Sequence, residues 1–495
     1  MSKKNQNYTN RKQNRFQPKR MRGNVFVNNS GKQWLPGENG RAAKIERLLR
    51  GAIEEKKEIA GNMAGYKDSG VEWIGAIPEG WNVSKVKHET SFIGSGTTPR
   101  SGCLSFYENG TIPWIQSGDL YETSEVTDTK QKITAEALRS SSALKVYDKD
   151  FIAMAMYGSI GNIAISRIAA CVNQACCCLR PNSKNNLNYM YYFLKTSTDN
   201  FKSKAMGAVL QNISQEKIKK QDFLVPPLPE QQRIADFLDT KCGILDRTID
   251  AVSRQIEDLE KYKKALITKT VTKGICKKGE PERAMKDSGV EWIGEVPEEW
   301  SVKPFKALAG MKGSSEYTAR DIVDEGEGAI LLSPSNINDN KLNLSKRTYI
   351  SQKKYDKSTT KIQRGDLLFT KTASVGKCVI YDSDEPAMPN PQLVVLKNIK
   401  CLPKFLYYSM VSDVMQAPTK MYVYGSVIPT ISQLNLGRIK IPVPSPEEQQ
   451  QIADYLDEKC KNIDNRVQKR KQQLEWLKEY KKSLIFDYVT GKKRV

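Results

Sequence analysis

Histidine is almost absent from this sequence, because His88 is the only one among 495 residues. Imidazole is the most common general base and a frequent zinc ligand, so one histidine gives little basis for histidine-dependent catalysis or a histidine-based metal site. The ten cysteines include no Cys-x-x-Cys pair. This spacing favours free thiols packed in strands of a reducing compartment. We therefore expect no bound metal.

Long apolar runs and phosphate-binding loops are also lacking. No stretch approaches the roughly 18 to 20 apolar residues that are needed to cross a bilayer. The first 22 residues are basic and polar, without the apolar segment of a secretory signal. The pattern Gly-x-x-x-x-Gly-Lys-Ser/Thr does not occur, so we expect no ATP binding by this chain. These absences favour a soluble, cytoplasmic protein without a membrane partner.

Positive charge is in excess, with 78 Lys and Arg against 56 Asp and Glu and a formal net charge of +22. Residues 1–62 alone hold 15 basic and 5 acidic residues, a difference of +10. A basic excess favours a polyanionic partner such as DNA. With few apolar residues, 1–62 is expected to be disordered in isolation. Met63 lies close behind this extension, so it is either a real basic arm or the product of an upstream start codon that is not used.

The chain is an internal duplication. The nine residues from Lys67 to Gly75 recur without change from Lys286 to Gly294, an offset of 219. A second block, Glu-Gln-Gln-x-Ile-Ala-Asp-Phe/Tyr-Leu-Asp, starts at Glu230 and again at Glu448. Between these matched ends the copies diverge strongly. Each half therefore has a constant opening, a variable body and a constant tail, which favours a shared scaffold that carries two different recognition surfaces.

The constant tails are predicted to be long helices. Proline-rich segments precede both, and apolar residues then recur at alternating spacings of four and three, which is the coiled-coil period. Two matching stripes in one chain should pair with each other, and equivalent helices related by a pseudo-two-fold axis must run antiparallel. A homodimeric coiled coil is the alternative. The stripe positions are Leu238, Cys242, Leu245, Ile249, Val252, Ile256, Leu259, Lys263 and Leu266, and then Leu456, Cys460, Ile463, Val467, Arg470, Leu474, Leu477, Lys481 and Leu484.

The variable bodies, 83–228 and 302–441, show short β-type runs punctuated by Gly, Pro, Asn and Ser, with helical patterns near 187–206 and 403–416. We read each body as a mixed α/β domain. Its loops are rich in the polar side chains that read base edges and phosphates. The candidate DNA contacts of the first body are Thr97, Thr98, Arg100, Gln116, Ser117, Asp119, Tyr157, Ser159, Gln174, Gln211 and Asn212. Those of the second are Ser333, Asn336, Lys371, Thr372, Ser374, Asn390, Gln392, Tyr424 and Ser426.

Two other features admit a second interpretation. Phe92-Ile93-Gly94-Ser95-Gly96 fits the Phe-x-Gly-x-Gly pattern that binds S-adenosylmethionine, but the nearest partner motif, Pro389 to Gln392, lacks the required aromatic residue. Intrinsic methyl transfer is therefore not expected, and we assign no catalytic residue. The tryptophans Trp73, Trp81, Trp292 and Trp300 could stack on bases, but core anchoring is favoured because they lie in the constant segments.

The repeated Lys-Asp-Ser-Gly-Val-Glu-Trp-Ile-Gly…Pro-Glu-x-Trp opening resembles that of type I restriction–modification specificity subunits. So do the pattern Gly96-Thr97-Thr98-Pro99…Ile112-Pro113-Trp114-Ile115…Gly118-Asp119-Leu120 and the proline-led Glu-Gln-Gln tail. The similarity covers 66–492. One departure is that Ile330-Leu331-Leu332-Ser333 stands where the first copy has Ile-Pro-Trp-Ile, so the two domains are expected to read different half-sites.

The resemblance implies two pseudo-symmetric target recognition domains joined by an antiparallel coiled coil of two long conserved helices. It also implies double-stranded DNA and two methyltransferase subunits as partners, with restriction–translocase subunits optionally added. S-adenosylmethionine, and ATP and Mg²⁺ for restriction, would be used by those partners, and this chain would bind no cofactor. The alternatives are a specificity subunit of a related type IIB-like methyltransferase–nuclease and a non-catalytic coiled-coil scaffold. The expected parts are an extension (1–62), a first recognition domain (63–228), a central helix (229–272), a linker (273–284), a second recognition domain (285–446) and a second helix (447–492).

Overall fold

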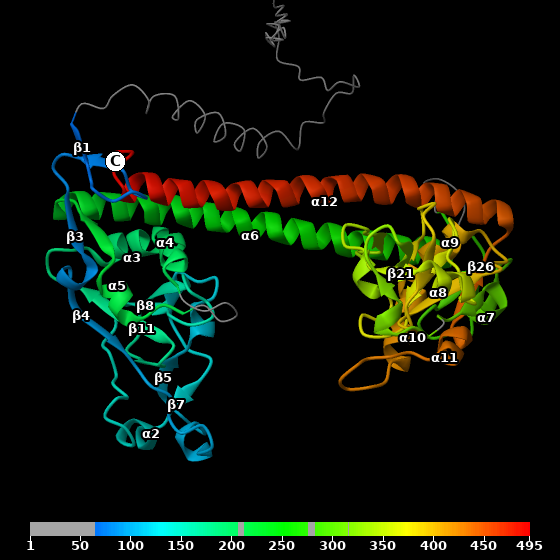
Figure 1. The fold of residues 1–495 in the computed structure, drawn as a ribbon, viewed down its shortest axis with the longest axis horizontal. Coiled ribbons are helices and arrows are strands. Elements are labelled where there is room, and N and C mark those ends of the chain that lie inside the picture. Colours follow the sequence, from blue (N-terminus) through cyan, green and yellow to red (C-terminus); the bar gives the residue numbers. More distant parts are fainter. Residues whose placement is uncertain (1–64, 206–211, 276–282, 315) are drawn as a thin grey trace, which may run out of the picture. The chain divides into compact units, whose positions relative to one another are not determined.

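The computed structural model describes residues 65–205, 212–275, 283–314 and 316–495 (Figure 1). These residues form two compact units. One comprises the described part of Met1–Phe237 together with Ile485–Val495, and the other comprises Leu238–Leu484. The expected basic extension 1–62, the candidate Gln211 and most of the expected linker lie outside the described residues. None of the described helices combines the length and apolar character that a membrane crossing requires.

Each constant opening is a short β-hairpin. Strands β1 (Tyr66–Asp68) and β2 (Ala76–Pro78) pair in the first copy, and β13 (Met285–Asp287) and β14 (Glu295–Pro297) pair in the second. The connecting turn needs a left-handed residue, which Gly70 supplies at φ 68° and Gly289 at φ 66°. The preceding aspartate accepts a bond from that glycine's amide, 3.0 Å long in both copies. The nine identical residues therefore form the same turn in both copies.

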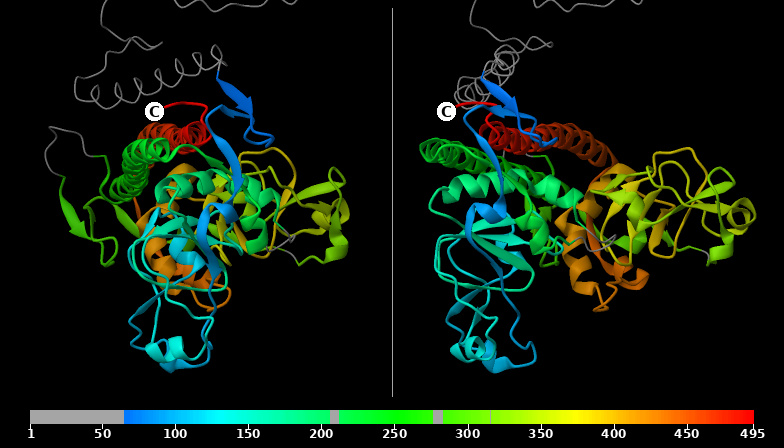
Figure 2. Two further views of the ribbon diagram at one scale, coloured as in Figure 1. Left: turned by 90° about the vertical axis from the view of Figure 1, so that its left-hand side faces the viewer. Right: turned by 60° about the vertical axis from the view of Figure 1, so that its left-hand side comes forward.

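The constant tails are helices α6 (Leu228–Lys273) and α12 (Pro446–Val489), which lie side by side in Figures 1 and 2. Lys263 pairs with Asp464 at 2.7 Å, and Lys481 pairs with Asp246 at 2.5 Å. The partner number rises as the α6 number falls, so the helices are antiparallel. Most stripe positions are buried, including Leu238, Leu245, Val252 and Ile256 on α6 and Leu456, Ile463, Val467 and Leu477 on α12. The predicted intramolecular coiled coil is confirmed.

The first body consists of two sheets and a few short helices. The five-stranded sheet has the order β4-β11-β8-β9-β6, and the three-stranded sheet has the order β10-β5-β7. The strands are β3 (Asn82–Lys85), β4 (Thr90–Ser95), β5 (Ile112–Ile115), β6 (Glu125–Val126), β7 (Lys132–Ile133), β8 (Phe151–Ala155), β9 (Ile163–Ser166), β10 (Cys171–Val172), β11 (Cys176–Pro181) and β12 (Asp222–Val225), which pairs with β3. The helices are α2 (Ala135–Arg139), α3 (Leu187–Thr196), α4 (Thr198–Ser203) and α5 (Gln215–Lys219). The predicted mixed α/β class is confirmed.

The second body repeats this plan with two four-stranded sheets, β16-β25-β22-β23 and β17-β21-β18-β24. Their strands are β16 (Gly310–Lys312), β17 (Ile322–Val323), β18 (Gly328–Leu332), β21 (Tyr349–Ser351), β22 (Leu367–Thr370), β23 (Cys378–Ile380), β24 (Ala387–Pro389) and β25 (Leu393–Lys397). Two further pairs are β15 (Ser301–Pro304) with β26 (Lys440–Val443) and β19 (Ile337–Asn338) with β20 (Lys341–Leu342). The helices are α7 (Phe305–Leu308), α8 (Gln352–Lys357), α9 (Pro403–Val411), α10 (Asp413–Tyr422) and α11 (Gln433–Arg438).

Cysteines and tryptophans of the first body serve its core. Cys176, Cys177 and Cys178 are buried in β11, as expected for packed thiols. Burial raises the pKa of Cys176 and of Cys178 to about 12, so both remain protonated thiols at neutral pH. Trp81 is almost fully buried, and Trp73 packs with its ring 6.0 Å from that of Phe193. The prediction that the constant-segment tryptophans anchor cores is confirmed for both.

Candidate nucleic-acid interface

In the second body, four segments meet at one end of the sheets. We call these segments together edge 2 (332–336, 371–376, 390–392 and 424–431). Parallel strands β18 and β24 end together, with Leu332 opposite Pro389. Strand β22 ends beside the start of β25, with Thr370 opposite Leu393. The segments that follow or precede these strand ends therefore lie together. They carry all nine candidate residues of the second body.

Backbone hydrogen bonds tie the segments of edge 2 into one framework. The Asn390 amide donates to the Leu332 carbonyl at 2.8 Å, and the Lys371 amide donates to the Gln392 carbonyl at 2.9 Å. The Ile431 amide in turn donates to the Lys371 carbonyl at 2.9 Å. Because every link is made by backbone atoms, the framework does not depend on which side chains the segments carry.

The first body has the same framework at its edge 1 (97–100, 115–119, 156–161, 173–175 and 212–213). The Asn173 amide donates to the Ile115 carbonyl at 3.0 Å, and the Met156 amide donates to the Ala175 carbonyl at 2.7 Å. The Ile213 amide donates to the Met156 carbonyl at 2.9 Å. These three bonds correspond one to one with those of edge 2. The two edges are therefore structural copies, although their sequences hardly align.

The side chains at equivalent positions of the two edges differ. Gln116 and Ser333 follow equivalent strands, as do Asn173 and Asn390. Tyr157, whose side chain is 49 % exposed, forms an isolated backbone β-bridge with Asn212. Its counterpart Thr372 forms the equivalent β-bridge with Thr430. A common backbone thus presents two different polar surfaces, as two readers of different half-sites require.

Three candidates have side chains that hold their own loops. The Asp119 carboxylate accepts bonds from the Gln116 amide at 2.9 Å and the Lys130 amide at 3.2 Å. In the equivalent turn of edge 2, buried Asn336 accepts from the Ser333 amide at 3.0 Å and donates to two carbonyls. Buried Asn390 accepts from the Gln392 amide at 3.0 Å. These residues shape the edges, and their neighbours are better placed to reach a ligand.

Other candidates are more accessible. The Thr98 hydroxyl donates to the exposed Gln174, and Gln116 donates to Gln131 at 2.8 Å. Exposed candidates are Arg100, Tyr157, Ser159, Gln174, Tyr424 and Ser426, and half-buried candidates are Thr97, Thr98, Gln116, Ser117, Asn212, Ser333, Lys371, Thr372, Ser374 and Gln392. Gln211 lies outside the described residues.

Sequence reasoning did not identify two features of the edges. Asn173 was not selected, although its counterpart Asn390 was, because the offset between the copies changes from 219 at the openings to 217 here. The apolar residues Val427 and Ile428 were also missed, because base-edge and phosphate recognition point to polar side chains. A comparison of the copies segment by segment, with a variable offset, would have paired Asn173 with Asn390.

The Phe-x-Gly-x-Gly segment lies in and just after strand β4, which pairs with β11. A β-carbon at Gly96 would stand 1.5 Å from the Val172 carbonyl oxygen, and one at Gly94 would stand 2.7 Å from the Tyr147 hydroxyl. Both glycines are therefore explained by the close approach of neighbouring groups within the domain. Their presence needs no cofactor.

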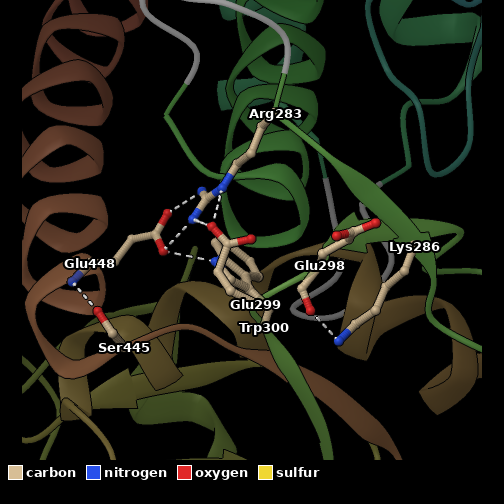
Figure 3. A network of polar contacts seen from close by, with 7 residues as sticks. All are labelled: Arg283, Lys286, Glu298, Glu299, Trp300, Ser445 and Glu448. Atoms are coloured by element: carbon tan, nitrogen blue, oxygen red, sulfur yellow. Dashed lines mark hydrogen bonds and ion pairs between the residues drawn. The ribbon is translucent and has the colours of Figure 1, made fainter.

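The tails and openings join around a tryptophan in each unit. Trp81 donates to Glu230 at 3.1 Å, and Trp300 donates to Glu448 at 2.8 Å (Figure 3). Arg283 forms an ion pair with Glu448 at 2.5 Å, as Figure 3 shows. The Arg283 guanidinium also lies over the Trp300 ring, 5.6 Å from its centroid. The charge-assisted hydrogen bonds that Arg283 donates to Glu448 and Glu299 raise the pKa of Arg283. The repeated Glu of each tail therefore fixes a helix start to its domain.

The next residue of each tail is a buried glutamine with the same role. Gln231 donates to the Pro226 carbonyl at 2.9 Å and accepts from the Asn186 amide at 2.9 Å. Gln449 donates to the Pro444 carbonyl at 3.0 Å and accepts from the Leu402 amide at 2.8 Å. Each therefore joins the start of a long helix to the start of a short one, α3 or α9. The Glu-Gln repeat is thus a structural signature.

Comparison with known proteins agrees with this architecture. The MjaVIII specificity subunit of a type I restriction enzyme from Methanocaldococcus jannaschii is 26 % identical over 62 % of this chain and 70 % of its own length. A second chain of that organism, described as the MjaX specificity subunit, is 29 % identical over 85 % of this chain and 96 % of its own. A chain in a solved structure of a type I restriction–modification system shares the fold with a TM-score of 0.64 and 15 % identity, over 84 % of this chain and 99 % of that one.

A profile of the type I restriction modification DNA specificity domain matches residues 78–261 and again residues 297–476. The two matches cover most of the chain and coincide with its two repeats. The chain therefore belongs to the family of type I restriction–modification DNA specificity proteins.

Proposed function

We propose that this chain is the DNA sequence-specificity subunit of a type I restriction–modification complex, and that each edge reads one half of a bipartite target. The observation that carries the proposal is the pair of edges, which share one backbone framework and present different side chains. Base edges are read by polar side chains, whereas a backbone framework sets only where those side chains stand. The basic net charge of +22 supports attraction to DNA phosphates.

The chain itself is proposed to carry out no chemistry. Methylation of a base requires that it be flipped into a pocket that holds the methyl donor. Partner methyltransferase subunits would supply that pocket with S-adenosylmethionine, and restriction–translocase subunits would use ATP and Mg²⁺. Because the constant openings and the constant helices occur twice, we expect them to present two equivalent docking surfaces. We therefore propose a complex with two methyltransferase subunits.

Domain exchange tests the division of labour. Residues 90–225 would be replaced by the equivalent segment of another specificity subunit, and the methylated motif would be read by methylome sequencing of the expressing cells. One half of the motif should change while the other half is retained. The exchange of 309–441 should change the opposite half. A change in both halves after either exchange would contradict the proposal.

A variant with three substitutions tests the side chains of edge 1 directly. Replacing Gln116, Tyr157 and Gln174 with alanine should weaken binding to the target duplex and leave binding to an unrelated duplex unchanged. Glu257→Gln, on the exposed surface of α6, is the matched control and should change neither. Native mass measurement of the co-purified complex tests the stoichiometry, and a one-to-one assembly at saturating partner would overturn it.

A further inference from the structure

The loop between helices α10 and α11 exposes an unusual amount of apolar surface. Val427 is 91 % exposed and Ile428 is 58 % exposed, and Tyr424 on the same loop and Met421 and Tyr422 at the end of α10 are also exposed. Single exposed apolar residues are ordinary, but five large ones within eight residues mark an interaction site. Figure 1 shows this loop, in orange, projecting from the second body beside α10 and α11.

The base of the loop is held firmly by edge 2. Tyr424 and Thr430 exchange two backbone hydrogen bonds, of 2.9 and 2.8 Å, which close the loop as a hairpin. The Ala373 amide donates to the Pro429 carbonyl at 2.8 Å, and Thr372 bridges to Thr430. The four residues between Tyr424 and Pro429, which we call the apolar tip (425–428), are thus presented from a fixed framework.

The surroundings of the apolar tip favour a polyanion. Residues 414–446 contain Lys420, Arg438 and Lys440 but no Asp or Glu, and residues 367–381 contain Lys371 and Lys377 and again no acid. The polar candidates Lys371 and Thr372 stand at the base of the same loop. An apolar projection from a polar edge that holds Lys371 and no acidic residue matches the proteins that insert aliphatic wedges between base steps.

We propose that Val427 and Ile428 form a wedge that enters the DNA stack at the half-site read by the second domain. The proposal rests on the proposed function, because it assumes that edge 2 faces DNA. The wedge would partly unstack one base step, and contacts from the polar edge would offset the cost. Steps that unstack easily would then be favoured, so the tip would contribute to sequence preference without a hydrogen bond to a base.

The first copy has a similar order of residue types at the matching offset of 218, since Gly207-Ala208-Val209-Leu210 corresponds to Gly425-Ser426-Val427-Ile428. Those residues lie outside the described part of the chain, so the proposal concerns the second domain alone.

The test uses the complete complex and 2-aminopurine, whose fluorescence rises when it is unstacked. The motif is first taken from methylome sequencing of cells that express the wild-type complex. Duplexes of that motif then carry 2-aminopurine in turn at each position of the second half-site. The wild-type complex should raise the fluorescence at one step besides the methylated adenine. Val427→Ser with Ile428→Ser should abolish that rise and weaken binding to the motif roughly 10-fold, which corresponds to about 1.4 kcal/mol, without changing binding to an unrelated duplex.

Ile322→Ser is the matched control, because Ile322 is another exposed aliphatic residue, 44 % accessible, on the outer strand β17 of the same domain. It should behave as wild type. A wild-type complex that methylates a motif but unstacks no further step overturns the wedge, as does a double variant that behaves as wild type. Loss of the methyltransferase from the double variant would identify the tip as a protein contact and also overturn it. Absence of any methylated motif would instead count against the proposed function.

Discussion

A single added methyl group at Gly161 should destabilise the first domain strongly, whereas the same change three residues earlier should not. Gly161 ends the loop of edge 1 and has φ 97°, and a β-carbon there would stand 2.0 Å from Cγ2 of Thr198. Gly158 has φ 67°, but a β-carbon there would meet nothing within 4 Å. The second copy already places Ala373, at φ 66°, in the position equivalent to Gly158.

The magnitudes follow from this geometry. A left-handed conformation costs an alanine roughly 1–2 kcal/mol relative to glycine, so Gly158→Ala should cost about that much. Gly161→Ala adds an overlap, because carbon atoms normally pack about 3.5–4.0 Å apart. Overpacking of this kind costs about 1–3 kcal/mol more, which brings the total to roughly 2–5 kcal/mol.

The free energy of unfolding of the purified full chain, measured by urea denaturation with circular dichroism, gives both values. Thr198→Ala provides a double-mutant cycle, since it removes the methyl group that the new β-carbon would meet. Gly161→Ala combined with Thr198→Ala should recover about 1–3 kcal/mol relative to the sum of the single changes. If Gly161→Ala costs no more than Gly158→Ala, the steric argument is refuted.

Three further predictions follow from the helix pair, the buried thiols and the basic extension. Lys481→Asp should lower the free energy of unfolding by about 1 kcal/mol, because it breaks an ion pair whose side chains are only 26 % and 47 % exposed. Adding Asp246→Lys to that variant should restore the lost stability. Failure of the reversed pair to recover stability in urea denaturation would contradict this. In the folded chain the pKa of Cys176 and of Cys178 is about 12, against 9.0 ordinarily, so the unfolded chain loses these thiol protons at lower pH. The free energy of unfolding should therefore fall as the pH rises from 9 to 12. At pH 8, both thiols should react with iodoacetamide more slowly than half-exposed Cys103. Deletion of residues 1–62 should lower non-specific DNA affinity most at low salt and leave the methylated motif unchanged, so a changed motif would show that the extension reads bases.

The scaffold could be predicted from the sequence because its signals are local and occur twice. A spacing of four and three residues defines a helix face wherever it occurs, and two equal faces in one chain predict their own pairing. The strands of the bodies were also predictable as short β-type runs, such as those at β8, β22 and β25. Their order in the sheets was not, because pairing between β5 and β10 or between β18 and β24 depends on contacts that are distant in the sequence.

The edges could be predicted only in part. Polar residue types indicated loops that the fold brings together at one end of each body, but they do not reveal whether a side chain faces a ligand or its own backbone. Asp119 and Asn336 have equivalent places in the two turns, and both bind the amide three residues earlier. Asp and Asn favour such local bonds for the same reason that they suit base recognition, because both offer a short side chain with a carbonyl-type oxygen. Composition alone cannot separate the two roles.

The charged residues in the helix stripe show what the duplication adds to the argument. A lysine in an apolar stripe weakens a coiled coil, yet Lys263 and Lys481 hold equivalent places, 218 residues apart. Their partners, Asp464 and Asp246, are separated by the same 218 residues. A slip of either helix by one heptad would leave each lysine without its aspartate, so the pairs select one register and reduce the stability of the others. Identity between the copies is thus found where both halves must do the same thing, in turns, joints and register, whereas the bodies that carry the edges diverge. A single duplicated chain therefore separates its scaffold from its recognition surface without any comparison to a relative.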